Sequence, residues 1–547
     1  MDTKRDQLPQ VRPTRGRPTA SGYEGACHDV VFLHRFRESP LSGNTSRFGI
    51  IASISPQQRG CLLNLTSPGD AERLRNFLAK AGYTEANLRM NVGMLDLPSS
   101  RLRNFARLQD LTSEPNCINT LVRWFWIGMP QDTRLAEKYV PAWFIPLALD
   151  CGLLRQQEDD LCPEVMLFPT DQFIFAADHT RKIDLEDPDL VLWPNPTSRL
   201  LARFTVRRPS CLTLDLGTGT GIQALTAAVH SDKVVATDLN PRAVAFATFN
   251  TRLNGIENVE CVVGNGFEPV AGRKFDLIVS NPPFFIAPAP QYLFCNNPLD
   301  LDQLCRQLVR AAPSYLNEDG YFQMLCEWAQ VQGQAWQERL AEWFEGTGCD
   351  AWVMKGYSED PGEYAQEHIR STTSSPARDG ALYDSYMTYY RHRNVEAING
   401  GLVIMRRRAG SNWTFFEEVE HSPKEPLGEL VLKTFATRDF LLSHSSTEQL
   451  LDLKPRFSEN VRLEQVFQQS PNGWKQESLT LRLVKGFHLF LGLQPVVAEF
   501  LSGCNGTQTL GELIGAFATK VDAPFEQVQK ECVDTIRKLI ERGFLLY

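Results

Sequence analysis

The residues most suggestive of chemistry lie in the stretch "DLIVSNPPFFIAP" at positions 276–288. Proline lacks an N–H and cannot continue a parallel strand, so Pro282 and Pro283 should end the apolar run before them. The Asn281 side chain and the Pro282 carbonyl then offer two acceptors, which suit a donor with two hydrogens, an –NH2 group. Phe284 adds a flat face for a planar group. The pattern favours a site for a planar amine or amide, and the alternative is a turn that merely ends a strand.

An amine on a base or an amide is a poor nucleophile because its lone pair is delocalised. Holding both N–H bonds can turn that lone pair out of conjugation and toward an electrophile. Catalysis at such a site would then depend on approach and alignment, without a metal or a covalent intermediate.

A glycine-rich loop, "LDLGTGTG", follows an earlier apolar run. In an open α/β sheet, ligands sit beyond the carboxyl ends of the strands, and glycine lets the backbone turn tightly and approach them closely. The spacing is G-x-G-x-G, unlike the G-x-G-x-x-G of dinucleotide folds, so no pyrophosphate site is demanded. An ordinary tight turn is the alternative. The candidate cofactor contacts in this loop are Asp215, Gly217, Thr218, Gly219 and Gly221.

Two further loops supply candidate cofactor contacts. "VVATDLN" ends a predicted strand with Asp238 and Leu239, and an acidic residue there can accept both hydroxyls of a ribose. The alternative is a helix N-cap, made by Asp238 or by Asn240. "GNGFEP" places Asn265 and Gly266 after the next strand, where an amide could contact an adenine amino group or simply form a turn.

The elements that must position these residues alternate between strand and helix over 211–283. Short, continuous apolar strands between helices indicate a parallel sheet covered on both faces. Helices near 300–313 and 332–345 and the strands "GYFQMLCEW", "DAWVMKG" and "GLVIMRRR" extend the pattern, so an α/β domain is expected over about 165–410. An aromatic-rich insertion at 357–399 is interpreted as packed helix, and the alternative is that its tyrosines (Tyr383, Tyr386, Tyr389 and Tyr390) line a substrate cleft.

Together, "DLGTGTG", "ATDLN" and "SNPPFF" resemble class I S-adenosylmethionine-dependent methyltransferases. More narrowly, they resemble the small-domain N-methyltransferases with an N-P-P-[FY] motif, which include release-factor glutamine-N5, rRNA guanine-N2 and tRNA adenine-N6 enzymes. The resemblance covers about 165–410 and implies a doubly wound, mostly parallel, seven-stranded sheet. It implies S-adenosylmethionine as cofactor, with Asp215 to Gly221 around its methionine part and Asp238 on its ribose. Asn281, Pro282 and Phe284 would hold the target nitrogen, with Pro283 completing the catalytic motif, and Asn281 would also contact the cofactor.

The chain departs from the relatives at several points. Asn265 stands where many relatives have Asp, although the rRNA guanine-N2 enzymes often show Asn. Phe285 stands where those enzymes usually have His. They also carry a duplicated N-terminal domain, whereas residues 1–160 contain no glycine loop. The helical N-terminal region looks more like that of the release-factor enzymes, which prefer Tyr in the motif.

The segments around the α/β domain are expected to form three further parts. Residues 1–27 are interpreted as a disordered tail and 28–164 as a mainly helical domain, with Trp124 as core. Residues 411–547 should open irregularly and close with three helices and a short strand, a winged-helix-like module. Such modules often bind nucleic acid, and the alternative here is a protein-binding or packing role.

Composition excludes several classes of protein. Of the 547 residues, 43% are hydrophobic and 22% charged, as in ordinary globular proteins, and no stretch is apolar enough to span a membrane. The net charge of −9 argues against non-specific coating of nucleic acid, although residues 1–130 hold 17 Lys or Arg against 11 Asp or Glu. The 13 cysteines form no C-x-x-C pair, which favours reduced thiols, a cytoplasmic protein and no metal site.

The sequence therefore predicts an S-adenosylmethionine-dependent N-methyltransferase with a macromolecular substrate. An RNA base, in rRNA or tRNA, and a glutamine in a translation-related protein are about equally compatible. A slight preference for RNA rests on Asn265, Phe284 and the basic N-terminal residues. A nucleotide-dependent oxidoreductase and a non-catalytic adaptor are the rival classes, and the intact N-P-P-F motif speaks against both.

Overall fold

A computed structural model describes residues 63–91, 105–179, 182, 187–289, 292–372, 376–419 and 425–547. The described residues form two compact units, one ending at residue 419 and the other beginning at residue 425. The predicted disordered tail lies outside the described residues. None of the helices within these ranges is both long enough and apolar enough to cross a lipid bilayer.

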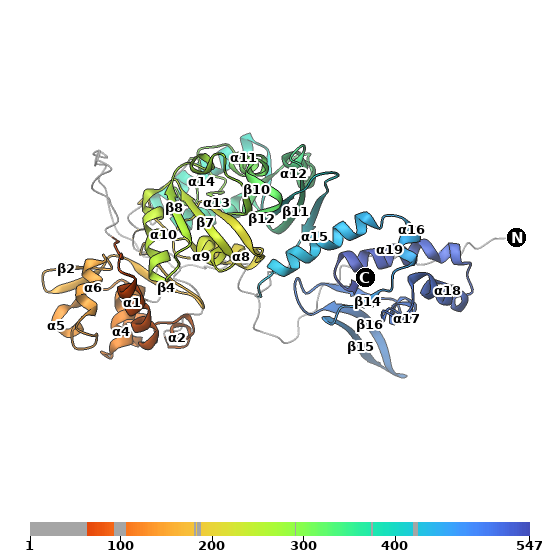
Figure 1. The fold of residues 1–547 in the computed structure, drawn as a ribbon, viewed down its shortest axis with the longest axis horizontal. Coiled ribbons are helices and arrows are strands. Elements are labelled where there is room, and N and C mark those ends of the chain that lie inside the picture. The colour runs from red at the N-terminus through yellow and green to blue at the C-terminus, as the bar shows by residue number, and fades with distance from the viewer. Residues whose placement is uncertain are drawn as a thin grey trace. The chain divides into compact units, whose positions relative to one another are not determined.

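An eight-stranded mixed sheet forms the centre of the first unit (Figure 1). Its strand order is β13-β11-β12-β10-β9-β6-β7-β8, in which β12 is antiparallel to both neighbours and the other pairs are parallel. The order reverses at β6, because the chain runs from β6 through β7 to β8 and then returns to β9 on the other side. The strands are β6 (Ser210–Leu216), β7 (Ser231–Asp238), β8 (Val259–Val263), β9 (Phe275–Ser280), β10 (Leu316–Val331), β11 (Cys349–Glu359), β12 (Val395–Arg407) and β13 (Thr414–Glu418).

The predicted number of seven strands is wrong, because β13 adds an eighth at the edge of the sheet. It pairs in parallel with β11, and its residues follow position 410, where an irregular segment was expected. Two aromatic contacts hold it there: Phe415 packs 6.5 Å from Trp352 and Phe416 packs 5.4 Å from Trp336, measured between ring centroids. Tertiary ring packing, rather than a regular apolar pattern, makes this segment a strand.

The strand and helix rhythm predicted for 211–283 is confirmed. Helix α9 (Ile222–Ala228) follows β6 and helix α10 (Pro241–Leu253) follows β7. The later predicted helices are confirmed as α11 (Gln303–Ala311) and α12 (Trp336–Phe344). The insertion is helical as well and consists of α13 (Pro361–Thr372) and α14 (Pro376–His392).

The N-terminal part of the first unit combines short helices with two small sheets. Its buried side chains, Trp124 among them, form one hydrophobic core with Phe246 of α10 and Leu225 of α9. Trp124 is therefore core, as expected. The elements are α1 (Pro68–Lys80), α2 (Glu85–Asn91), α3 (Phe105–Leu111), α4 (Cys117–Val122), a π-helical turn (Arg123–Ile127), α5 (Thr133–Ala136), α6 (Phe144–Asp150), β1 (Gln131–Asp132), β2 (Leu154–Gln157), β3 (Asp160–Pro163), β4 (Met166–Pro169) and β5 (Ile174–Ala177).

A linker joins β5 to α8 (Pro196–Phe204). The sequence "DLVLWPN" at 189–195 is a short apolar run bounded by Asp and Pro, a pattern that predicts a strand, but this prediction is wrong because the segment is irregular. Its backbone bonds to side chains in place of a neighbouring strand: the Val191 N–H donates to Asp178 at 2.9 Å, and the Asp189 carbonyl accepts from Asn240 at 3.0 Å.

The second unit ends as predicted, with three helices and a short strand, and Thr509 and Glu512 form a capping box at the start of the second of these helices. Its beginning is not irregular, because further helices and a three-stranded antiparallel sheet precede the last helices. The winged-helix assignment stays a prediction. The elements are α15 (Gly428–Ser443), α16 (Thr447–Leu451), β14 (Arg456–Phe457), β15 (Val461–Ser470), β16 (Gly473–Leu483), β17 (Phe490–Gly492), α17 (Pro495–Ser502), α18 (Leu510–Lys520), α19 (Phe525–Glu541) and β18 (Leu545–Leu546).

Candidate active site

The glycine loop lies where the sheet order reverses, between the end of β6 and the start of α9. Gly217, Gly219 and Gly221 have φ values of 78°, 55° and 88°, in the left-handed region that favours glycine. A Cβ added to Gly217 or Gly219 would meet no atom within 4 Å. The backbone therefore faces open space on that side, as a loop that receives a ligand should. At Gly221 the reason differs, since a Cβ would lie 3.2 Å from Leu225.

Asp215 is buried beneath this loop, with 1% of its surface exposed. Its Oδ2 accepts hydrogen bonds from the Thr218 hydroxyl at 2.6 Å and the Ala224 N–H at 2.9 Å. Its Oδ1 has no partner among the described residues. Burial raises the pKa of this carboxyl to about 7, although the two hydrogen bonds lower it. Asp215 thus fixes the loop with one oxygen and leaves the other for a ligand.

Asp238 joins the end of the second strand to the glycine loop. Its Oδ2 accepts from the Gly219 N–H and its Oδ1 from the Asn240 N–H, both at 2.9 Å. Burial raises the pKa of Asp238, and these two backbone bonds lower it. The helix cap is Asn240, whose side chain accepts from the Arg242 N–H. Because each carboxylate oxygen can accept more than one hydrogen bond, Asp238 keeps acceptor capacity for a diol.

The remaining predicted cofactor contacts lie at the edge of the same site. Leu239 follows Asp238 directly and is 57% exposed. Asn265 is exposed and its carbonyl accepts from the Glu268 N–H at 3.0 Å, so it forms a turn. Gly266, with φ of 52°, belongs to that turn. The main-chain bond from Gly264 to the Asp238 carbonyl, 2.9 Å long, brings this turn to the tip of β7.

The N-P-P-F residues follow β9, beside β6 in the sheet. The Ser280 hydroxyl donates to the Leu216 carbonyl at 2.8 Å and ties the two strand ends together. Neither the Asn281 side chain nor the Pro282 carbonyl has a hydrogen-bond partner in the described part of the chain, whereas the Pro283 carbonyl accepts from Asn297 at 2.7 Å. Both acceptors predicted for an –NH2 group therefore lack a partner among the described residues, with Asn281 half-buried and Pro282 buried.

Phe284 differs from what the sequence suggested. Its side chain is only 8% exposed, so most of its flat face is covered. Its ring packs 5.6 Å from that of Phe285, which in turn meets the ring of His368 edge-on at 4.0 Å. The ring therefore stiffens the loop more than it displays a stacking surface.

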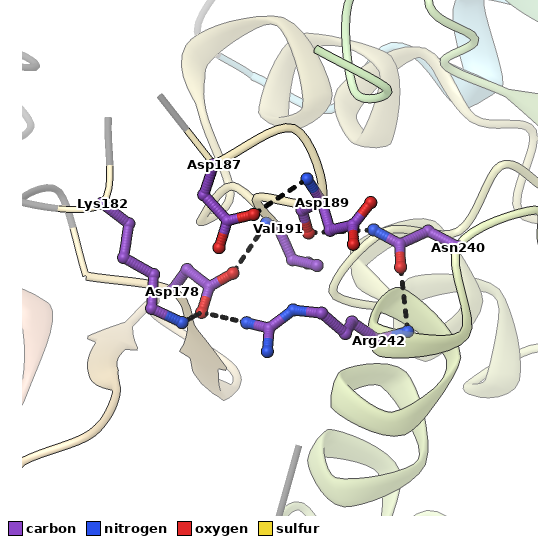
Figure 2. A network of polar contacts seen from close by, with 7 residues as sticks. All are labelled: Asp178, Lys182, Asp187, Asp189, Val191, Asn240 and Arg242. Atoms are coloured by element: carbon purple, nitrogen blue, oxygen red, sulfur yellow. Dashed lines mark hydrogen bonds and ion pairs between the residues drawn. The ribbon is translucent and has the colours of Figure 1, made fainter. Parts of the chain in front are cut away.

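Sequence reasoning missed a polar network that holds the linker against the tip of β7 (Figure 2). Asp178 is fully buried, and its Oδ1 accepts from Lys182 and from Arg242, each at 2.5 Å. Asn240, which caps α10, also donates to the Asp189 carbonyl (Figure 2). The network fixes the strand tip that carries Asp238. Sequence gave little signal for it, because its members lie up to 64 residues apart.

Within the described ranges, no group of three or more His, Cys, Asp or Glu side chains is placed so that it could hold a metal ion.

Comparison with known proteins gives two matching family models. Residues 195–347 match "Methyltransferase small domain", and residues 433–547 match a "Domain of unknown function (DUF7782)". The first match includes the glycine loop, Asp238 and the N-P-P-F residues.

Three similar curated proteins are each named release factor glutamine methyltransferase. The one from Geobacter sulfurreducens is 30% identical over an alignment of 204 residues, and the match covers 34% of this chain and 68% of that protein. The one from Aquifex aeolicus is 39% identical over 101 residues, 17% of this chain and 36% of the relative. The one from Salmonella typhimurium is 44% identical over 92 residues, 16% of this chain and 32% of the relative. The chain thus matches only about a third of the length of the last two.

Solved structures show weaker similarity. A 16S rRNA N2 G1207 methyltransferase of T. Thermophilus, in complex with AdoMet and guanosine, is 17% identical, with 41% of this chain and 60% of that chain covered and a TM-score of 0.24. A methyltransferase from Pyrococcus furiosus is 16% identical, with 39% and 82% covered and a TM-score of 0.24.

Proposed function

Because the chain belongs to the small-domain family of class I S-adenosylmethionine-dependent methyltransferases, we propose that it methylates the side-chain amide of a glutamine in a protein. The proposal rests on two acceptors that follow the end of β9, the Asn281 side chain and the Pro282 carbonyl. Neither has a hydrogen-bond partner among the described residues. They match the two hydrogens of a primary amide.

The residues around the glycine loop fit the cofactor. The unpartnered Oδ1 of Asp215 and the open side of Gly217 and Gly219 suit the methionine part, and the remaining acceptor capacity of Asp238 suits the ribose hydroxyls. Leu239 and the turn at Asn265 would flank the adenine. When bound, S-adenosylmethionine would supply a methyl group on a positively charged sulfur: the methyl would move to the acceptor nitrogen, the sulfur would keep the electron pair of the broken S–C bond as S-adenosylhomocysteine, and the nitrogen would release one proton to solvent.

The protein's own contribution is to bind and orient the acceptor. Asn281 Oδ1 and the Pro282 carbonyl would each accept one N–H of the target nitrogen, which fixes the amide plane. With both N–H bonds held, the nitrogen lone pair can turn out of conjugation and toward the cofactor side of the strand ends. Positioning of this kind can supply several kcal/mol of the barrier reduction, roughly 7 to 11 kcal/mol in well-oriented model reactions.

A glutamine is favoured over an RNA base on two grounds. The Geobacter relative, named for release-factor glutamine, is matched over 68% of its length. The preference for RNA rested partly on Phe284 as a stacking surface, and that ring is largely buried. The positive balance of residues 1–130, which also supported RNA, is spread along that stretch, and residues 1–62 of it lie outside the described ranges.

Methyl transfer from tritiated S-adenosylmethionine to cell extract tests the proposal, followed by protease or nuclease treatment. We expect the label to be protease-sensitive and nuclease-resistant, and Asn281→Ala to lower it by about 100-fold. Asn412→Ala, at an exposed position between β12 and β13, is the matched control and should label normally. Nuclease-sensitive label would identify RNA as the acceptor, and equal labelling by wild type and Asn281→Ala would refute the site.

A further inference from the structure

The loop that carries the N-P-P-F residues is held from outside by the insertion between β11 and β12. Ile286, two residues after Phe284, is completely buried, and tyrosine hydroxyls bond both of its backbone polar groups. Its N–H donates to the Tyr364 hydroxyl of α13 at 3.1 Å, and its carbonyl accepts from the Tyr390 hydroxyl of α14 at 2.7 Å. Two helices of the insertion thus grip one residue of the loop.

Tyr364 is itself oriented by a buried carboxyl on the sheet. Its hydroxyl donates to Glu327 Oε2, which leaves its oxygen to accept from Ile286. Glu327, 1% exposed, lies on β10 three positions beyond Met324, the register partner of Ser280 at the end of β9. Glu327 therefore lies at the same edge of the sheet as the loop.

Residues at the same level of β10, β12 and β11 leave room for a second hydrogen bond to the Glu327 carboxyl. Gly400 on β12 is the register partner of Glu327 on β10 and of Tyr357 on β11. The Tyr357 ring passes over Gly400 so closely that an added Cβ would lie 2.1 Å from its ring carbon. Across this gap the Tyr357 hydroxyl donates to Glu327 Oε1 at 2.6 Å. Both carboxyl oxygens are thus held, and Gly400 makes the second contact possible.

We propose that Tyr364, oriented by Glu327, is a positioning residue that fixes Ile286 and through it the loop bearing Asn281 and Pro282. This inference rests on the proposed function of that loop, and it assigns the insertion a role: its helices hold the acceptor side of the site. The cofactor side, on β6 and β7, does not depend on this contact.

Tyr364→Phe removes the hydroxyl and keeps the packed ring, so it is the test variant. Tyr389→Phe is the matched control, because the Tyr389 hydroxyl also accepts from a backbone N–H, that of Leu301 at 2.8 Å, and donates to a carboxylate, Asp300. Tyr389 lies on the insertion too but does not contact Ile286 through its hydroxyl.

Two measurements decide the matter. Hydrogen exchange of peptides covering 281–288 should be about tenfold faster in Tyr364→Phe at the Ile286 amide and unchanged in Tyr389→Phe, since a buried N–H loses its acceptor. With tritiated S-adenosylmethionine and a fixed amount of cell extract, Tyr364→Phe should lower the maximal rate about tenfold or more. The KM for S-adenosylmethionine and the affinity for S-adenosylhomocysteine should not change.

Equal exchange and equal maximal rates in the two variants would overturn the inference while leaving the proposed function standing. A weakened affinity for S-adenosylhomocysteine in Tyr364→Phe would also overturn it, because the effect would then be general. A wild-type protein that transfers no methyl would instead refute the proposed function, and with it the rate readout, while the exchange comparison would still report whether Tyr364 holds Ile286.

Discussion

The Asp238 carboxylate accepts a hydrogen bond from the Gly219 N–H at 2.9 Å, so the tip of the second strand holds the loop that follows the first. The same carboxylate bonds the N–H of Asn240, the cap of α10. A residue expected to contact ribose is therefore also a structural link between two loops of the proposed cofactor site. Replacing Asp238 should therefore weaken cofactor binding and loosen the link between the two loops.

Asp238→Ala is expected to weaken binding of S-adenosylhomocysteine by at least about 10-fold, since it removes hydrogen bonds to a charged acceptor. Asp276→Ala is the control: that carboxylate also accepts two backbone N–H bonds, from Cys211 and Leu212, but at the opposite end of β6. It should lower stability and leave affinity intact. Calorimetric titration with S-adenosylhomocysteine measures the affinity of each variant. Equal losses of affinity in Asp238→Ala and Asp276→Ala would contradict the assignment of Asp238.

Comparing Gly217→Ala with Gly272→Ala distinguishes two effects of an added Cβ: strain in the backbone and obstruction of the proposed cofactor site. Gly217 and Gly272 both have φ of 78°, and a Cβ on either would meet no protein atom within 4 Å. Each substitution should therefore lower the free energy of unfolding by a similar amount, about 1 kcal/mol. Only Gly217→Ala should weaken binding of S-adenosylhomocysteine, because only that Cβ enters the proposed methionine site. Similar affinities in the two variants would mean that the open side of Gly217 receives no ligand.

Ionisation of the buried Glu327 carboxyl should lower the free energy of unfolding of the first unit as pH rises. Burial raises its pKa from 4.5 to about 8, so between these values the folded protein keeps a proton that the unfolded chain has lost. Stability is then highest at the acid end of this window and falls toward pH 8. Glu327→Gln should reduce that fall by on the order of 3 kcal/mol. Asp215, whose pKa is raised to about 7, adds a smaller fall of the same sign.

Urea denaturation of wild type and Glu327→Gln at pH 5 and pH 8 measures the difference. Glu260→Gln serves as control, because Glu260 is an exposed carboxyl whose pKa is lowered by its hydrogen bond to Lys233. It should leave the fall in place. Parallel losses of stability in wild type and Glu327→Gln would show that Glu327 ionises normally.

The strands and loops nearest the cofactor site could be predicted from sequence because their signals are local. The apolar runs of β6, β7 and β9 each end at a residue of distinct type, Leu216 before glycine, Asp238 before a capped helix and Ser280 before Asn-Pro-Pro. Parallel strands then bring these ends to one edge of the sheet. Local pattern and global fold agree here.

The parts that sequence could not give depend on partners far away in the chain. Glu327 reads as a polar interruption in an apolar strand, and its partner Tyr364 comes 37 residues later. The irregular path of 189–195 follows from side chains such as Asp178, which no periodicity reveals. The Phe284 ring likewise packs against Phe285, whose other ring partner, His368, comes more than 80 residues later on the insertion.

The hydrophobic core shared between the N-terminal helices and α9 and α10 limits how the protein can be divided. A fragment cut to the matched family segment, 195–347, would strip that cover from Leu225 and Phe246 and would lack β11, β12 and β13. We expect such a fragment to aggregate on expression and a fragment ending at 419 that retains the N-terminal helices to stay monodisperse in gel filtration. The segment that matches the family model is therefore shorter than the smallest fragment that folds by itself. A 195–347 fragment that is monodisperse in gel filtration would disprove this.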